Sequence, residues 1–247
     1  FPYRCCGNCA IEPDGDGHVT IPNNWTIIEK NAFDACSSLS AITIPDSVTS
    51  IASFTFQFCK ELAGVTIPDS VTSIGERAFQ FCSSLSTIAI PNSVVSIGRS
   101  AFFGCASLPT ITIPNSVSSI HNSTFQSCLQ LSTITIPDSV TSIGDSTFQS
   151  CTSLSTITIP NSVTIIGRYA FASCSSLRSV IIPDSVTSIG DAAFKYCSNL
   201  HTITIPNNVT TIGDVALPSC VGFGLSLDVV EDNNPRGVVQ CVSCDSE

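Results

Sequence analysis

The sequence predicts a repeat solenoid of stacked coils, with a β-strand on one side of each coil and a short helical turn on the other. A proline and a cysteine each return every 23 residues, and the apolar residues between them keep the same order. A fixed period of this length is typical of solenoids, in which each unit buries its apolar face only against its neighbours. The prolines are Pro22, Pro45, Pro68, Pro91, Pro114, Pro137, Pro160, Pro183 and Pro206. The cysteines are Cys36, Cys59, Cys82, Cys105, Cys128, Cys151, Cys174, Cys197 and Cys220.

The first element of each unit is a short strand. In residues 156–159, threonine alternates with isoleucine, and alternation of β-branched residues is typical of a half-buried strand. Pro160 ends this strand because proline cannot donate a hydrogen bond to a neighbouring strand. Asn161 and Ser162 then provide the polar residues of a turn.

The second element is the return of the chain on the far side. Gly167 allows a tight bend. Phe171, Cys174 and Leu177 follow at spacings of three, which is the period of a 3₁₀ or short helical turn. We therefore expect one helical turn in each coil, with the phenylalanine, the cysteine and the leucine pointing inward.

Two rows of identical residues form the predicted core. One row is Ile44, Ile67, Ile90, Ile113, Ile136, Ile159, Ile182 and Ile205. The other is Phe33, Phe56, Phe79, Phe102, Phe125, Phe148, Phe171 and Phe194, with Leu217 at its end. We expect the cysteines of the repeat to be free buried thiols, because parallel side chains on neighbouring coils are poorly placed for disulfides.

The repeated phrase resembles a known family. Leu131-Ser-Thr-Ile-Thr-Ile-Pro-Asp-Ser-Val-Thr-Ser-Ile-Gly, followed by Ala/Thr-Phe-x-x-Cys-x-x-Leu, is similar to the BspA-like (Treponema-type) leucine-rich repeat over about residues 19–220. The resemblance implies a right-handed leucine-rich-repeat solenoid with a parallel sheet on one side. It also implies a secreted or cell-surface protein that serves in protein binding or adhesion rather than catalysis.

Three regions follow from the repeat. Residues 1–21 form a cysteine-rich N-terminal cap, residues 22–220 hold eight full 23-residue units and part of a ninth, and residues 221–247 form a C-terminal cap. Within that last cap, residues 229–239 read as a β-hairpin over the final coil. The cysteines outside the repeat are Cys5, Cys6, Cys9, Cys241 and Cys244. They suggest cap disulfides and an oxidising compartment, or else a head-to-tail link between chains.

Composition limits the partners and the location. The net charge of −10 argues against a nucleic acid or an anionic membrane as partner. The sequence contains no run of 18 apolar residues, the length that would be needed to span a bilayer. A first residue Phe1 in place of methionine suggests a mature secreted product. Sequons at Asn24, Asn122 and Asn208 fit a glycoprotein.

The sequence contains no recognisable catalytic or metal-binding motif. The three histidines, His18, His121 and His201, lie on different coils, and no serine is placed near both a histidine and a carboxylate by the repeat. We therefore expect no enzyme activity, no cofactor, no metal site and no small-molecule ligand.

Two surfaces remain as candidate sites. Phe54, Phe58, Phe81 and Phe103 depart from the polar consensus on neighbouring coils and form a candidate protein-contact patch, unless the rings tuck between turns. The sheet face carries Thr110, Thr112, Thr133, Thr135, Thr156, Thr158, Thr202 and Thr204. Three hypotheses follow: protein binding or adhesion, a structural subunit that associates with itself, and ice or mineral binding through the threonine face.

Overall fold

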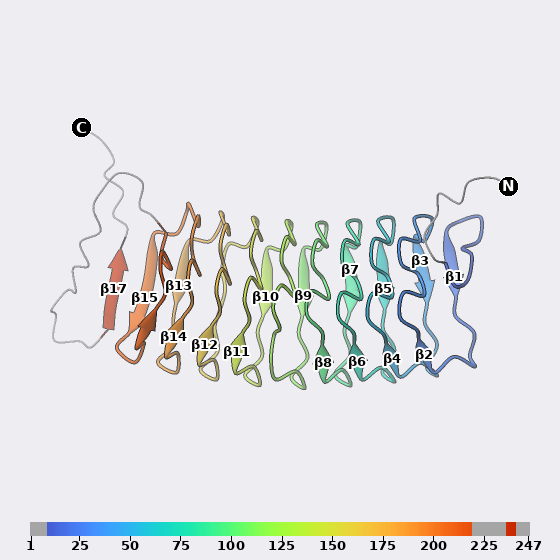
Figure 1. Ribbon diagram of the computed structural model, residues 1–247, viewed down its shortest axis with the longest axis horizontal. Helices are drawn as coiled ribbons and strands as arrows, with labels where there is room; N and C mark the ends of the chain where they lie inside the picture. The colour runs from blue at the N-terminus through green and yellow to red at the C-terminus, as the bar shows by residue number, and fades with distance from the viewer. Residues whose placement is uncertain (1–8, 219–235, 241–247) are drawn as a thin grey trace.

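A computed structural model describes residues 9–218 and 236–240 and shows parallel coils stacked into an elongated solenoid (Figure 1). We number the coils 1–9 from the prolines Pro22 to Pro206 that begin them. Strands 23 residues apart pair in parallel, as Val19 with Ile42 and Ile28 with Ile51. The predicted solenoid of parallel strands is therefore confirmed.

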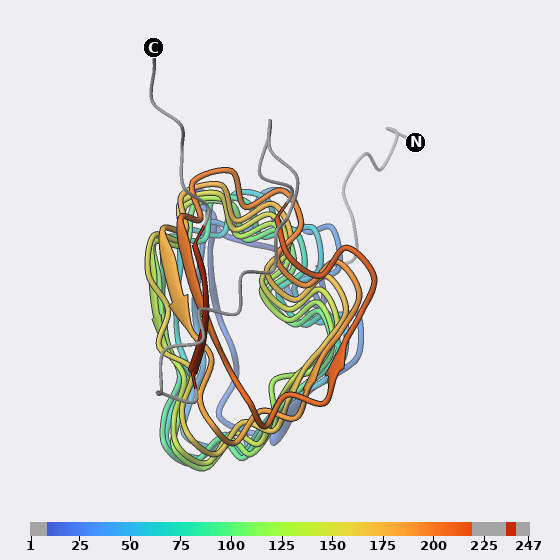
Figure 2. The ribbon, with the colours of Figure 1, turned by 90° about the vertical axis from the view of Figure 1, so that its left-hand side faces the viewer.

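Most coils have strands on two sides, as the end-on view in Figure 2 shows, whereas Ile120, Thr156 and Thr158 form only isolated bridges. The longer strands form the first side: β1 (His18–Thr20), β3 (Ala41–Thr43), β5 (Gly64–Thr66), β7 (Thr87–Ala89), β9 (Thr110–Thr112), β10 (Thr133–Thr135), β13 (Ser179–Ile181) and β15 (Thr202–Pro206). Two-residue strands form the second side: β2 (Ile27–Ile28), β4 (Ser50–Ile51), β6 (Ser73–Ile74), β8 (Ser96–Ile97), β11 (Ser142–Ile143), β12 (Ile165–Ile166), β14 (Ser188–Ile189) and β16 (Thr211–Ile212). The sequence predicted the first side only.

The predicted helical turns are absent from the described residues, and this part of the prediction was wrong. Two residues in each of these turns adopt a left-handed backbone, such as Ser146 (φ 54°) and Ser150 (φ 62°), and a right-handed helix cannot continue through them. Between these two residues, successive backbone amides donate their hydrogen bonds alternately within the coil and to the next coil. Gln149 N donates within the coil to Ser146 O (3.2 Å), whereas Phe148 N donates to Ala170 O of the next coil (2.7 Å).

The phenylalanine row runs through the centre of the solenoid. All eight side chains from Phe33 to Phe194 are fully buried. The centroids of consecutive rings lie 5.2–5.6 Å apart. Burial of one such side chain contributes about 1.5–3 kcal/mol, so the row is a continuous source of stability along the molecule.

The polar residues of the repeat also join the coils. Ser162 Oγ donates to Val140 O at 2.6 Å and Thr164 Oγ1 donates to Thr141 O at 3.2 Å. Equivalent serine and threonine bonds recur in most of the other coils. The repeated polar residues are thus explained by contacts between coils, because each one satisfies a backbone carbonyl.

Both sheets are interrupted near the middle of the solenoid. No hydrogen-bonded ladder joins β7 to β9. Ser86 N and Ser132 N each donate a hydrogen bond to the preceding coil. Pro109 occupies the equivalent position and has no N–H to donate. On the second side, Gly98 N and Gly144 N donate to the preceding coil at 2.9 Å. His121 occupies the equivalent place and makes no such bond within the described coils. The 23-residue unit of residues 87–109 is therefore joined to the following unit, residues 110–132, chiefly by the turns and the core.

The last strand covers one edge of the solenoid. β17 (Arg236–Gln240) pairs antiparallel with β15, so that Ile203 lies opposite Val239. The other arm of the expected hairpin lies outside the described residues. Pairing along β15 satisfies backbone groups that would otherwise be left at an open edge.

Gly167 provides a test of how closely the coils approach. A Cβ at this position would lie 2.6 Å from both Asp145 N and Gly144 C of the preceding coil. We expect Gly167→Ala to lower the free energy of unfolding by about 1–3 kcal/mol, because the two backbones would have to separate. Urea denaturation followed by circular dichroism measures this change.

Ser150→Gly is the matched control. Ser150 has a left-handed backbone, and glycine already occupies the equivalent position in coil 4 as Gly104 (φ 75°). Relief of strain in the folded chain and greater freedom of the unfolded chain should nearly cancel, leaving stability unchanged within about 1 kcal/mol. Equal stabilities of Gly167→Ala and the wild type would contradict the close approach.

Candidate functional site

Three of the four predicted patch residues form a stack on the turn edge of coils 2–4. The rings of Phe58 and Phe81 lie 5.2 Å apart with an interplanar angle of 6°. The rings of Phe81 and Phe103 lie 4.8 Å apart and are tilted by 55°. We call Phe58, Phe81 and Phe103 the aromatic stack. Phe58 is 39% exposed, whereas the other two rings are half-buried.

Gly104 makes room for the aromatic stack. A Cβ at Gly104 would lie 2.5 Å from Cδ1 of Phe81, so the ring of Phe81 lies directly against this glycine. Gly104 was not among the residues predicted for this site, although it replaces the serine found at the same position of later coils as Ser127, Ser150 and Ser173.

Phe54 lies in a different environment. Its ring has Lys30 Nζ at 5.3 Å and Arg77 Cζ at 5.4 Å from the ring centroid, one cation from each neighbouring coil. Such contacts stabilise a half-exposed pair by about 0.5–1 kcal/mol. Phe54 is therefore held by charged neighbours, and no ring contact joins it to the aromatic stack within the described residues.

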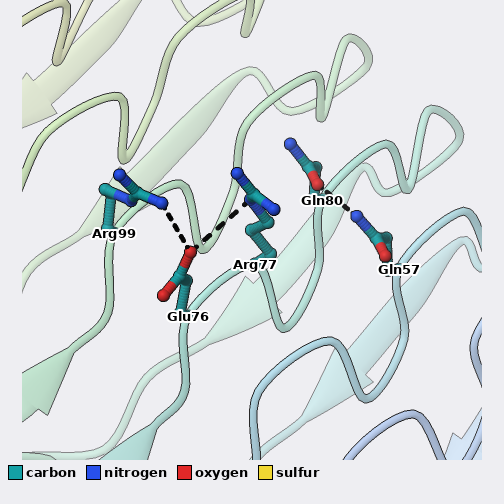
Figure 3. A network of polar contacts seen from close by, with 5 residues as sticks. All are labelled: Gln57, Glu76, Arg77, Gln80 and Arg99. Atoms are coloured by element: carbon teal, nitrogen blue, oxygen red, sulfur yellow. Dashed lines mark hydrogen bonds and ion pairs between the residues drawn. The ribbon is translucent and has the colours of Figure 1, made fainter.

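Polar pairs also connect coils 2–4 (Figure 3). Glu76 Oε1 accepts a hydrogen bond from Arg99 Nη2 at 2.9 Å and lies 3.6 Å from Arg77 Nε. Gln57 Nε2 donates to Gln80 Oε1. The side chains of the ion pairs are half-exposed or exposed, so each ion pair contributes at most about 1 kcal/mol. Gln80, in contrast, is buried. These polar pairs fix the relative positions of coils 2–4 rather than supply a chemical activity.

The predicted row of buried thiols is present with one exception. Cys59, Cys82, Cys105, Cys128, Cys151, Cys174 and Cys197 are free and buried. Cys36 is instead bonded to Cys9, with Cα atoms 5.2 Å apart, so a cysteine of the cap joins the first coil. Cys5, Cys6, Cys220, Cys241 and Cys244 lie outside the described residues.

Burial dominates the chemistry of the free thiols. It raises the pKa of Cys59, Cys128 and Cys197 to about 12. Each Sγ also donates to a backbone carbonyl, as from Cys151 to Phe125 O at 3.1 Å. A thiol that stays protonated in an apolar core is a poor nucleophile. These cysteines are suited to packing.

The threonine face is exposed over its middle part. Thr110, Thr112, Thr133, Thr135, Thr156 and Thr158 are exposed, whereas Thr202 and Thr204 are half-buried. The array is not regular. Thr156 and Thr158 belong only to isolated bridges, and the next coil presents Ile181, which is 71% exposed, in the same row.

The three sequon asparagines are exposed. Asn122 Oδ1 accepts from Asp145 N at 3.0 Å, and Asn208 Nδ2 donates to Asp184 O at 2.8 Å. Glycosylation of Asn24, Asn122 and Asn208 stays a prediction. Within residues 9–218 and 236–240, no group of three or more His, Cys, Asp or Glu side chains could hold a metal ion. Nor does this part of the chain contain a helix able to cross a membrane.

Comparison with known proteins agrees with this architecture. The family model described as "BspA type Leucine rich repeat region (6 copies)" matches residues 5–132 and 118–224. A leucine rich cell surface protein from Faecalibacterium prausnitzii is 31% identical in sequence, with a TM-score of 0.65. The match covers 81% of this chain but only 66% of that chain, slightly under two thirds.

A second solved structure shows the same fold. It is a leucine-rich repeat protein from Eubacterium ventriosum, 22% identical, with a TM-score of 0.62, covering 89% of this chain and 68% of that one. No curated protein matches the sequence significantly.

The raised pKa values of the buried thiols predict how the free energy of unfolding depends on pH. A thiol in the unfolded chain has an ordinary pKa of 9.0, whereas the folded Cys59, Cys128 and Cys197 titrate at about 12. Unfolding therefore releases protons above pH 9. The free energy of unfolding should be insensitive to these thiols below pH 9 and fall toward pH 12, by about 1.4 kcal/mol per pH unit for each one.

Urea unfolding under reducing conditions at several alkaline pH values measures this slope. Cys151→Ala removes one such thiol, since burial also raises the pKa of Cys151. The slope of this variant should be smaller by about 1.4 kcal/mol per pH unit. Identical slopes for the wild type and the variant would show that the thiol is not protected in the folded chain.

Proposed function

The chain belongs to the BspA-type leucine-rich repeat family, and we propose that it is a non-catalytic protein-binding or adhesion protein that acts outside the cell or at its surface. The aromatic stack is the single observation that carries this proposal. Aromatic side chains, phenylalanine included, are enriched in protein interfaces relative to the rest of the protein surface.

The position of the aromatic stack supports a role in binding rather than in folding. Phe58 and Phe81 lie in a row where coils 5–7 have Ser127, Ser150 and Ser173. The serines show that a small polar residue is compatible with the same turn. Phe58 gains less from burial than a core phenylalanine does, because this residue remains 39% exposed.

The proposed location has two supports. The disulfide between Cys9 and Cys36 is of a kind that forms and persists in oxidising compartments. The similar protein from Faecalibacterium prausnitzii is described as a cell surface protein. Secretion and adhesion are therefore part of the proposal, together with a protein partner or a second copy of the chain as ligand.

Substitution of the rings by the residue of the other coils tests the proposal. We expect Phe58→Ser combined with Phe81→Ser to reduce partner binding about 30-fold or more, because a single interface anchor contributes about 2 kcal/mol or more. Proteins from the surroundings of the producing cell are captured on immobilised wild type and variant, and affinities of the purified candidates are then measured by biolayer interferometry.

Ser173→Ala is the matched control, since it changes the same row three coils beyond the last coil of the aromatic stack. It should retain every partner that the wild type retains. The proposal fails if the double variant keeps its fold, by circular dichroism and thermal unfolding, and binds all candidates as tightly as the wild type does.

Self-association is a second candidate, favoured by the C-terminal edge of the second sheet. β16 pairs with β14 and with no other strand of the described chain. Ile212 at this edge is 49% exposed and Val215 is 61% exposed. Open strand edges pair readily with other chains, so a structural subunit built by end-to-end contact fits these residues.

Light scattering with and without reductant separates the two candidates. A monomer mass in both conditions supports a binding protein. Higher masses that fall in Ile212→Lys support association through β16, because a charge at the edge opposes pairing. Higher masses that collapse on reduction place the junction at the terminal cysteines instead. Ice or mineral binding through the threonine face stays a third hypothesis, which the irregular sheet does not favour.

A further inference from the structure

We propose that the exposed face of Phe58 and the carboxylate of Asp34 form a subsite for one arginine side chain of a protein partner. This inference rests on the proposed binding role of the aromatic stack and names the chemistry of the group that continues the stack.

The stack ends abruptly on its N-terminal side. In the row that contains Phe58 and Phe81, the preceding coil has Ala35. Ala35 N donates to Gln57 O at 2.6 Å, so these two coils are in direct contact. The ring of Phe81 covers one face of Phe58 at 5.2 Å. On the other side the preceding coil has the methyl group of Ala35 in place of a ring, so no aromatic ring of the described residues stacks on that face of Phe58.

Asp34 directly precedes Ala35 and is half-buried. Its carboxyl group has no hydrogen-bond or ion-pair partner among the described residues. The Oδ1 atom is inaccessible to solvent. The amide of Gln57, at the equivalent position of the next coil, donates to Gln80 instead. A carboxylate oxygen left without a donor destabilises the charged form.

The environment of Asp34 disfavours its charged form, which a cationic partner would stabilise. Burial raises the pKa of this carboxyl group, and no compensating charge opposes that effect. Because Oδ1 is inaccessible to solvent, Oδ2 is the oxygen that an incoming donor would meet. A guanidinium group supplies up to five N–H donors in one plane, so it can stack on a ring and bind a carboxylate at the same time.

The chain itself shows this kind of contact elsewhere. Lys30 and Arg77 lie on either side of Phe54. In coil 8, Lys195 lies 4.8 Å from the ring of Tyr196, and these two residues occupy the positions of Asp34 and Ala35. The net charge of −10 favours encounter with a basic partner. Arginine fits better than lysine because only the guanidinium is planar.

Nuclear magnetic resonance of the full chain with ¹³C-labelled phenylalanine rings tests the subsite. The probe is N-acetylarginine methylamide, and N-acetylcitrulline methylamide is its uncharged analogue. We expect the arginine probe to shift the Phe58 resonances in a saturable way, with the citrulline analogue binding about 5-fold more weakly, equivalent to about 1 kcal/mol. Equal effects of the two probes would overturn the proposal.

Three variants locate the site. Asp34→Asn should weaken arginine binding about 5-fold. Ala35→Phe should abolish it by covering the exposed face of Phe58 with a ring, in a row that already holds left-handed Phe58 and Phe81. Ser127→Phe adds the same ring to coil 5 and should leave binding unchanged. Unchanged binding in Asp34→Asn or in Ala35→Phe contradicts the subsite.

The outcome is separate from that of the proposed function. If the double serine variant loses its protein partner while Phe58 does not respond to the arginine probe, the aromatic stack binds a partner of another chemistry and this inference is wrong. If the arginine probe binds as expected but the double variant keeps all partners, the subsite stands and the proposed role of the stack fails.

Discussion

The structure depends on one constraint: every coil is held by hydrogen bonds and ring contacts to the coil 23 residues away. A single coil has too little apolar surface to fold alone, so its strands, turns and core must match those of its neighbours. The requirement explains the buried phenylalanine row. It also explains why Ser162 and Thr164 recur, since each donates to a carbonyl of the preceding coil.

Residues that depart from the repeat are therefore informative in two ways. Pro109 and His121 interrupt the sheets, one by lacking a donor and the other by replacing a glycine at a close approach. The turn bonds from Phe102 N and Gly104 N to the next coil remain at 3.0 and 2.8 Å, so the stack of coils continues. Phe58 and its neighbours instead leave the backbone unchanged and alter the surface, as expected of an interface.

The period was enough to predict the solenoid, its strands and its core, because each repeated residue must serve the same contact. The second sheet was missed because two-residue strands such as β4 (Ser50–Ile51) are too short to show alternation. The helical turns were predicted wrongly because a spacing of three does not reveal the left-handed backbone at Ser146 and Ser150. Two features of the candidate site could not be predicted at all. The Cys9–Cys36 bond and the cations around Phe54 depend on which side chains meet across coils.

Hydrogen exchange of the native chain, followed by mass spectrometry, tests the central claim that contacts between coils hold the fold together. The account predicts slow exchange for the amides of Phe102 and Gly104, which donate to the next coil. It predicts faster exchange for His121, where the sheet is interrupted. Rapid exchange at Phe102 and Gly104, or equal protection at all three amides, would contradict it, because the turns would then not be the continuous connection between the two halves of the solenoid.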